Sequence, residues 1–381
     1  MPLLPILFVN ALLHVYVGWR IAPALPAGPW AALLLVTLLA SALLMPLGLL
    51  ARRIRSQPLS DRLAWAGLLA MGLFSSLFVL TLARDALHVL AALAHWTGMV
   101  AAVSPGLLQA TAAAVPLLGS LVTLLGFVNA RRTAAVVHVD VPIADLPQAL
   151  HGFTIAQISD IHVGPTIKRP YLSRIVRCVN ALGADMVAVT GDLVDGSVLE
   201  LARHVAPLAG LTSRHGTFFV TGNHEYYSGA HDWVVELRRL GLRVLMNEHV
   251  VLDHGAAKLV VAGVTDHSAH HFDPSQRSDP HAAIAKAPTH ATVRVLLAHQ
   301  PRSAEAAERA GFQLQLSGHT HGGQFLPWNL FVRLQQPFTA GLHRLRRLWV
   351  YTSRGTGYWG PPKRFGAPSE ITHLRLVPAT P

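Results

Sequence analysis

Long apolar runs fill the first third of the chain, and they predict membrane-spanning helices. Four runs reach or approach the ~20 residues that a helix needs to cross a bilayer, at residues 3–21, 30–50, 63–83 and 107–129. A further apolar stretch, residues 86–103, fits a fifth span, a continuation of the third helix or an interfacial helix. We therefore expect a helical transmembrane domain of four or five spans over residues 1–132.

Three histidines fall within these runs, at His14, His88 and His95. Polar groups in lipid are unfavourable and sometimes mark a transport path. Histidine is a weak sign of such a path, so hydrogen bonds between helices or an interfacial position are favoured.

From Gly152 onward the pattern changes to short apolar runs that alternate with amphipathic helical segments. Strands that are buried on both faces read as continuous apolar runs. Six such runs are present, at residues 153–159, 185–190, 217–221, 259–263, 293–298 and 313–317. Helical patterns lie between several of them, at residues 171–182, 199–208, 231–240 and 303–310.

The end of the chain differs, because residues 349–353 and 371–376 read as closing strands without a helix between them. We therefore expect an α/β sandwich with mixed sheets over residues 152–381. Residues 133–151, which include two prolines, read as a linker with an extended lead-in to this domain.

Charge is distributed in the same two parts. Before Arg131 the sequence contains no lysine and no glutamate. Basic loops tend to stay on the cytoplasmic side, and the basic residues form two clusters, one from Arg52 to Arg62 and one at Arg131 and Arg132. If both clusters are cytoplasmic, the number of crossings between them is even.

Four spans then place the α/β domain in the cytoplasm, whereas a fifth span would place it outside. We expect an integral protein of the bacterial inner membrane with a cytoplasmic α/β domain. The net charge of +11 is better explained by attraction to anionic lipid than by nucleic acid, because no nucleic-acid-binding module or aromatic–basic stacking pattern is present. We therefore expect membrane lipids, and no nucleic acid, as partners.

Polar clusters follow five of the predicted strands. They are Asp160-Ile161-His162, Gly191-Asp192, Gly222-Asn223-His224-Glu225, His299 and Gly318-His319-Thr320-His321. Ligands bind at the strand ends of open α/β sheets. The five ends together offer carboxylate, imidazole and amide groups, a ligand set suited to two neighbouring transition-metal ions. Each cluster alone is a weak signal, but the ordered set is a strong one.

The spacing of these residues suggests how they bind. Asp160 and His162 are two positions apart, so in an extended continuation of the strand both side chains point the same way. Asp192 follows a glycine that permits a sharp turn, and its two carboxylate oxygens suit it to bridge two metal ions. The ligands contain no cysteine, which argues against a thiolate site, but they do not fix the metal.

The ordered set D-x-H, G-D, G-N-H-E, H and G-H-x-H resembles the calcineurin-like metallophosphoesterase superfamily. The resemblance covers residues 152–376. The strings QISDIHVG, VAVTGDLVDG, GNHEYY, LSGHTHGGQ and GTGYWGPPKR are similar to its bacterial membrane-anchored branch. The resemblance implies a four-layer α/β/β/α sandwich, which agrees with the predicted elements.

The resemblance also implies two divalent metal ions, Mn, Fe or Zn, that share one ligand. The first ion would be held by Asp160, His162, Asp192 and His321. The second would be held by Asp192, Asn223, His299 and His319. His224 would bind no metal; it would stabilise charge near the phosphate and protonate the leaving oxygen, with Asp160 orienting it.

These expectations describe a membrane-anchored enzyme that hydrolyses phosphoester or pyrophosphate bonds by metal-activated water. Anchoring suggests a lipid-linked or envelope substrate, by association only. The alternative is a cyclic-nucleotide phosphodiesterase or a nuclease that uses the same metal centre. A non-catalytic scaffold is disfavoured because the ligand set is intact, and the sequence leaves the oligomeric state open.

A basic and aromatic stretch near the end of the chain has two interpretations. Residues 358–362 read either as part of a substrate groove or as a packed turn. Arg354, Lys363 and Arg364 read either as phosphate contacts or as surface charge.

Overall fold

The computed structural model describes residues 3–54, 56–288 and 293–379, which leaves out Arg55 of the basic loop. The chain divides into two compact units. Unit 1 comprises Met1–Val128 with Gly360–Lys363, and unit 2 comprises Asn129–Trp359 with Arg364–Pro381. Each unit is considered by itself.

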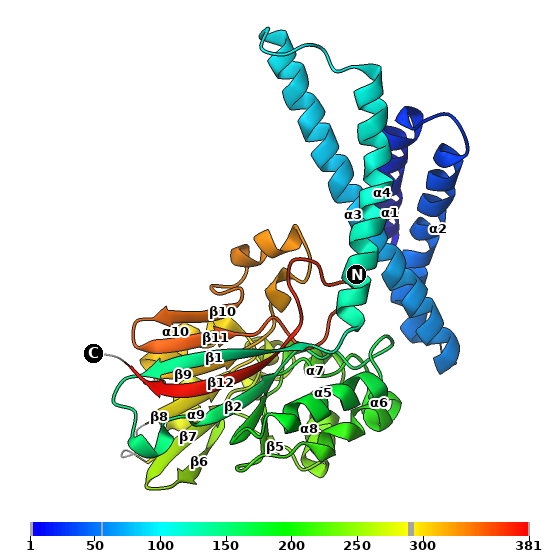
Figure 1. Ribbon diagram of the computed structural model, residues 1–381. Coiled ribbons are helices and arrows are strands. Elements are labelled where there is room, and N and C mark those ends of the chain that lie inside the picture. Colours follow the sequence, from blue (N-terminus) through cyan, green and yellow to red (C-terminus); the bar gives the residue numbers. More distant parts are fainter. Residues whose placement is uncertain (1–2, 55, 289–292, 380–381) are drawn as a thin grey trace. The chain divides into compact units, whose positions relative to one another are not determined.

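Unit 1 is built from four helices (Figure 1), each long and apolar enough to cross a membrane. They are α1 (Leu3–Ile21), α2 (Trp30–Leu50), α3 (Gln57–Trp96) and α4 (Pro105–Arg131), the last residues of which belong to unit 2. Helix α3 runs without interruption for 40 residues. Residues 86–96 therefore continue the third helix and do not form a fifth one.

Polar side chains pair across the helices of unit 1. The Nε2 atom of His14 lies 3.1 Å from Ser41 Oγ, which joins α1 to α2. His88 Nε2 lies 3.1 Å from Thr111 Oγ1, which joins α3 to α4. The expectation of hydrogen bonds between helices is confirmed for His14 and His88, whereas His95 Nδ1 lies 3.0 Å from the carbonyl oxygen of Val100, in the stretch after α3. Pairing of this kind satisfies polar groups that lipid cannot satisfy.

The short segment Gly360–Lys363 also belongs to unit 1. The side chain of Lys363 is buried and donates hydrogen bonds to the carbonyl oxygen of Gly72, at 3.1 Å, and to Ser76 Oγ. Burial lowers the pKa of Lys363 to about 8. The ammonium group is therefore engaged by α3, so the surface charge expected for this lysine is wrong and the contacts do not favour the phosphate interpretation either.

Unit 2 contains two six-stranded sheets. The first has the strand order β1-β12-β2-β3-β4-β5, and the second has the order β10-β11-β9-β8-β7-β6. The strands of the first sheet are β1 (Ala135–Ile143), β2 (Thr154–Ile158), β3 (Met186–Val189), β4 (Thr217–Phe219), β5 (Arg243–Val244) and β12 (Glu370–Pro378). Those of the second are β6 (Glu248–His254), β7 (Ala257–Gly263), β8 (Val293–Leu297), β9 (Leu314–Ser317), β10 (Gly341–Leu345) and β11 (Leu348–Thr352).

Both sheets are mixed, as the sequence predicts. Strand β12 is antiparallel to β2 and parallel to β1, and antiparallel pairs join β10 to β11 and β6 to β7. Strand β1 lies within the residues expected to form a linker and an extended lead-in. It pairs with β12 along its whole length, from Ala135↔Glu370 to Ile143↔Pro378.

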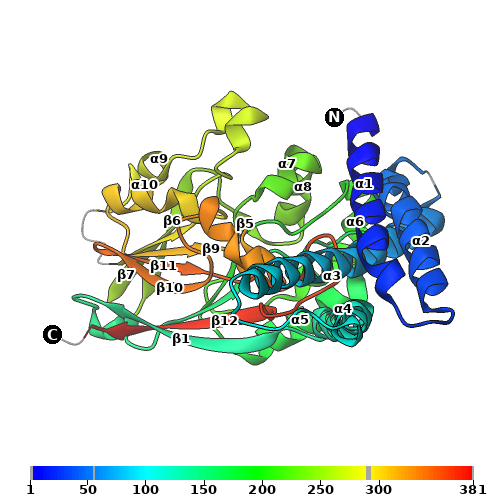
Figure 2. The same ribbon diagram turned by 90° about the horizontal axis from the view of Figure 1, so that it is seen from above.

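Helices cover the outer faces of the two sheets. Helices α5 (Arg169–Ala181), α6 (Val198–Val205) and α8 (Ala230–Arg239) gather at one side of the sheets in Figure 1. Helices α9 (Pro280–Ile284) and α10 (Ala304–Arg309) lie on the same side of the second sheet in Figure 2. The four-layer α/β/β/α sandwich is thus confirmed.

Side-chain alternation explains this layering. In β3, Met186 and Ala188 face the core between the two sheets, whereas Val187 and Val189 pack with α5 and its neighbours. Successive side chains of a strand point to opposite faces, so a strand with helices on one side and a sheet on the other must be apolar throughout. Strands β2, β3 and β4 are parallel, which brings their carboxyl ends to one edge.

Candidate metal centre

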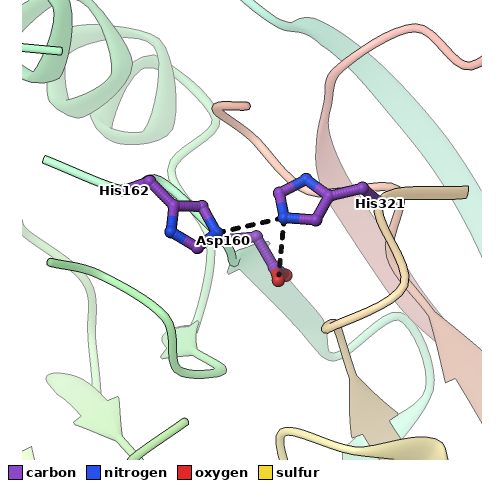
Figure 3. A group of neighbouring side chains, drawn as sticks. All are labelled: Asp160, His162 and His321. Atoms are coloured by element: carbon purple, nitrogen blue, oxygen red, sulfur yellow. Dashed lines mark hydrogen bonds and ion pairs between the residues drawn. The ribbon is translucent and has the colours of Figure 1, made fainter. Parts of the chain in front are cut away.

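The first group of expected ligands converges from the loops after β2 and β9 (Figure 3). Suitable ligand atoms of Asp160, His162 and His321 all lie within 4.8 Å of one another. The Nε2 atoms of the two histidines are 3.0 Å apart, and His321 Nε2 is 3.6 Å from Asp160 Oδ1. All three residues are buried. The arrangement has the size and the donor types of a metal site.

The second group comes from the loops after β3, β8 and β9. Ligand atoms of Asp192, His299 and His319 also lie within 4.8 Å of one another. His299 Nε2 is 3.1 Å from Asp192 Oδ2 and 3.2 Å from His319 Nδ1. The Nδ1 atom of His299 is 2.8 Å from the carbonyl oxygen of Thr190. A hydrogen bond donated to this carbonyl leaves Nε2 available as a ligand.

Asp192 lies between the two groups. Besides its contact with His299, its Oδ2 atom is 4.0 Å from His162 Nε2 in the first group. Its other oxygen, Oδ1, accepts a hydrogen bond of 2.9 Å from the backbone N–H of His224. The Asp192 carboxylate therefore lies close to ligand candidates of both groups.

Asn223 provides an independent test of whether a cation fits here. Its side chain is 8% exposed, and its Oδ1 atom is buried without a hydrogen-bond partner among the described residues. Burying a polar oxygen without a partner is unfavourable by about 1–3 kcal/mol. An oxygen that approaches a cation is satisfied, so the buried amide oxygen of Asn223 has the chemistry of a metal ligand.

The charges in the site also favour a cation. Burial and the nearby charge of Asp192 raise the pKa of Asp160, although the histidines nearby act in the opposite direction. Burial would also raise the pKa of Asp192, but the facing imidazole of His299 outweighs it and holds the pKa well below its usual value. Two buried carboxylates so close together favour bound positive charge.

The backbone at the ligands is unusual. Asp160, His162, Asp192, His319 and His321 all have φ between 50° and 71°. Residues other than glycine rarely adopt this left-handed conformation, and strain of this kind clusters at functional sites. The expectation that Asp160 and His162 share a face of an extended strand is therefore wrong. Strand β2 ends at Ile158, and two left-handed residues aim the side chains instead.

Two glycines of the motifs are explained by close approach. A Cβ atom on Gly222 would collide with Asp192 Oδ1, and one on Gly318 would collide with Ser159 Oγ and Asp160 Oδ2. The chain passes so near the ligand carboxylates at both positions that only glycine fits.

His224 is held by a carboxylate that we did not single out from the sequence. Its Nδ1 atom lies 2.5 Å from Asp195 Oδ1, and Asp195 also lies 3.3 Å from His162 Nδ1. Asp160, which we expected to orient His224, instead accepts the backbone N–H of His319 at 2.9 Å. The reason is local: the turn after β3 carries Asp195 beside the helix α7 (Asn223–Tyr227), in which His224 lies.

The charges around His224 favour its protonated form. Burial would lower the pKa of this imidazole, but the hydrogen bond to Asp195 and the charges of Asp192, Asp195 and Glu225 outweigh it. Together they raise the pKa to about 9. With Nδ1 held by Asp195, the other nitrogen, Nε2, lies on the side of Asp192, 4.0 Å from its Oδ2.

Glu225 joins two loops of the site through hydrogen bonds. It is fully buried, and its carboxylate accepts the backbone N–H groups of Gly222, Asp192 and Leu193 at 2.6, 3.0 and 2.8 Å. One side chain thus ties the loop after β4 to the loop after β3. The glutamate of the GNHE string was visible in the sequence, but nothing in its spacing indicated this role.

The nearby arginines have structural partners. Arg364 is buried, and its Nη1 donates to the carbonyl oxygen of His321 at 2.9 Å while its Nη2 lies 2.9 Å from the ring Nδ1 of the same residue. Arg354 forms an ion pair of 2.9 Å with Glu370. Arg364 therefore helps to position a metal-ligand candidate, and neither contact favours the phosphate interpretation.

This fold and site define a calcineurin-like metallophosphoesterase. Residues 153–323 match the profile of the family described as calcineurin-like phosphoesterase. A metallophosphoesterase of Aquifex aeolicus is 33% identical over 224 residues, which are 58% of this chain and 84% of that protein. The chain belongs to this family.

Two further relatives are described as transmembrane proteins. A transmembrane protein with metallophosphoesterase domain from Danio rerio is 37% identical over 286 residues, 73% of this chain and 65% of that protein. A protein of the same description from Bos taurus is 40% identical over 272 residues, 68% of this chain and 61% of that protein. The chain spans less than two thirds of the length of both. With the four apolar helices of unit 1, this similarity identifies a membrane protein.

Proposed function

We propose that the protein is a membrane-anchored, dinuclear metal-dependent phosphoesterase that hydrolyses phosphoester or pyrophosphate bonds. The observation that carries the proposal is the convergence of two ligand groups, one of which includes Asp192 while the other comes within 4.0 Å of it. Five loops that are remote in sequence meet at this point. Without a cation, the Oδ1 atom of Asn223 is buried and has no hydrogen-bond partner among the described residues.

The proposed ligand sets follow these groups. Asp160, His162 and His321 would hold one divalent ion, His299, His319 and Asn223 would hold the other, and Asp192 would be shared. When bound, two divalent ions supply Lewis acidity that activates water as the nucleophile and neutralises charge on the phosphate. Nitrogen and oxygen ligands of this kind accept Mn, Fe or Zn.

The residues of the chain supply the rest of the chemistry. Asp195 fixes the ring of His224 through Nδ1, so Nε2 is the nitrogen that can face a bound phosphate. A protonated imidazole at this position stabilises negative charge and can donate its proton to the leaving oxygen. Glu225 keeps the two loops that carry Asp192 and His224 in register.

Membrane attachment supports a finer proposal about substrate and location. Anchoring tethers unit 2 to a bilayer, which favours a phosphorylated substrate that is lipid-linked. The basic residues from Arg52 to Arg62 and at Arg131 and Arg132 support four crossings with unit 2 on the cytoplasmic side of a bacterial inner membrane.

The test is purification of the full chain with added Mn²⁺, followed by metal analysis and a phosphoester panel. The panel contains p-nitrophenyl phosphate, its bis-ester, nucleotide sugars, cyclic nucleotides and lipid phosphates. The matched variants are His224→Ala, which should keep both metals and lose about 10²–10⁴-fold in turnover, and Asp192→Ala, which should lose both metals.

The panel separates the candidate functions. Turnover of the monoester, nucleotide sugars or lipid phosphates supports the proposal, and preference for cyclic nucleotides supports the alternative. A protein that holds two metals per chain and hydrolyses nothing in the panel would refute the enzymatic proposal. Full metal content in Asp192→Ala would refute the assignment of Asp192 as a ligand shared by both ions.

A further inference from the structure

An exposed apolar segment follows the last metal-ligand candidates. Within residues 326–334, five large hydrophobic side chains are exposed: Leu326, Trp328, Leu330, Phe331 and Leu334. Their exposed fractions run from 42% for Trp328 to 81% for Leu334. Elsewhere among the described residues of unit 2, exposed side chains of this kind are not packed so densely along the chain. A contiguous apolar surface marks an interaction site.

The backbone of this segment is fixed by hydrogen bonds, although its side chains are exposed. The backbone N–H of Leu326 donates to the carbonyl oxygen of Phe365 at 3.1 Å, and two short helical turns, Trp328–Leu330 and Val332–Leu334, follow. At the far end, Arg302 Nε donates to the carbonyl oxygen of Gln335 at 2.7 Å. Because the N–H groups of the five exposed apolar residues are paired within the protein, these residues can enter an apolar environment without burying unpaired N–H groups.

Charge around the segment indicates the partner. The sequence contains no aspartate and no glutamate from Arg309 to Ser369, whereas arginines recur through this stretch. Arg333 is exposed near the end of the segment. Tryptophan, leucine and phenylalanine beside exposed arginine form the composition of elements that lie in a membrane interface, where basic residues meet anionic headgroups.

The chain connection places lipid within reach. Helix α4, long and apolar enough to cross a membrane, ends at Arg131, and strand β1 of unit 2 begins at Ala135. The three residues between them span at most about 10 Å. Unit 2 is therefore tethered close to a bilayer surface whichever way it turns.

We propose that residues 326–334 form an interfacial lipid-binding surface that docks unit 2 onto an anionic bilayer. Leu330, Phe331 and Leu334 enter the boundary between headgroups and acyl chains, and Arg333 pairs with lipid phosphate. This surface is separate from the metal ligands, so the proposal stands whether or not the protein is a phosphoesterase.

The experiment uses the full chain in nanodiscs of phosphatidylcholine with phosphatidylglycerol, in a Cys178→Ser background that removes the single native cysteine. A polarity-sensitive fluorophore is attached at Leu330→Cys or Leu334→Cys. The matched controls are Leu199→Cys and Val235→Cys, which are also exposed apolar positions of unit 2, at 96% and 56%. Quenching is measured with nitroxide lipids and with aqueous iodide, after each variant is shown to be folded by thermal unfolding.

The expected result is a blue-shifted emission at positions 330 and 334, with strong quenching by nitroxide lipid and several-fold weaker quenching by iodide than at positions 199 and 235. Arg333→Glu should reduce the lipid quenching at position 330. Equal quenching at all four positions would overturn the proposal. Protection from both quenchers at position 330, together with cross-links between chains, would assign the surface to a second copy and would overturn it too.

Discussion

Replacement of Asp195 by asparagine tests the arrangement around His224 most directly. The asparagine side chain has the same shape, so it can still accept a hydrogen bond from Nδ1 of His224, which lies 2.5 Å from the present carboxylate. The negative charge is lost. Asp195 and His224 are both largely buried, with side chains 9% and 14% exposed, so solvent screens little of the change.

The expected fall in kcat follows from the type of hydrogen bond that His224 forms with residue 195. A hydrogen bond to a charged group contributes about 1.5–3 kcal/mol, and a neutral one about 0.5–1.5 kcal/mol. The difference of about 1–1.5 kcal/mol corresponds to roughly a tenfold fall in kcat. Asp195 also contacts His162 Nδ1 at 3.3 Å. Loss of such a partner behind a metal-binding histidine lowers metal affinity by about 10–100-fold.

The assay therefore separates two quantities. kcat is measured at saturating Mn²⁺ on the substrate that the wild-type protein turns over best, and metal affinity is measured by titration of the metal-free protein. We expect kcat of Asp195→Asn to fall roughly tenfold with both metals bound, and less than for His224→Ala. The control is Asp160→Asn, which should lose metal from the first group.

Two results would refute this reasoning. An unchanged kcat at saturating metal would show that Asp195 does not act through His224. A comparable loss of kcat in Asp160→Asn with both metals retained would return the orienting role to Asp160, as the sequence suggested.

Three further predictions concern the loops that hold the site. Gly222→Ala should abolish metal binding at the second group, because a Cβ atom would collide with Asp192; normal metal content by mass spectrometry would contradict this. Glu225→Gln should lower the free energy of unfolding by about 1–3 kcal/mol, because an amide cannot accept all three N–H groups; calorimetry against wild type measures it, and an unchanged transition would exclude the role. Removal of metal by a chelator should lower the unfolding temperature of wild type more than that of Asp192→Ala, because cations that bind only the folded state stabilise it; equal shifts would indicate that the ions bind elsewhere.

Sequence patterns were sufficient to predict the main elements and the chemistry of the donors. Hydrophobic periodicity is a local property, so it gave the bounds of α1 and α2 and the apolar strands that carry the five polar clusters. Family resemblance gave the order of the ligand types, and from it the four-layer sandwich. Local patterns could not give β1, because its pairing partner β12 lies more than 200 residues further along the chain.

The contacts between the donor groups and the orientation of their side chains are visible only in the folded chain. The family resemblance implied Asp160 as the partner of His224, whereas the turn after β3 brings Asp195 there. The left-handed backbone at five ligand candidates has no signature in residue type, because it is imposed by packing around the site and not by local preference. Contacts between distant residues and strained conformations depend on the whole fold. A pattern in the sequence therefore predicts which residues are donors but not their geometry.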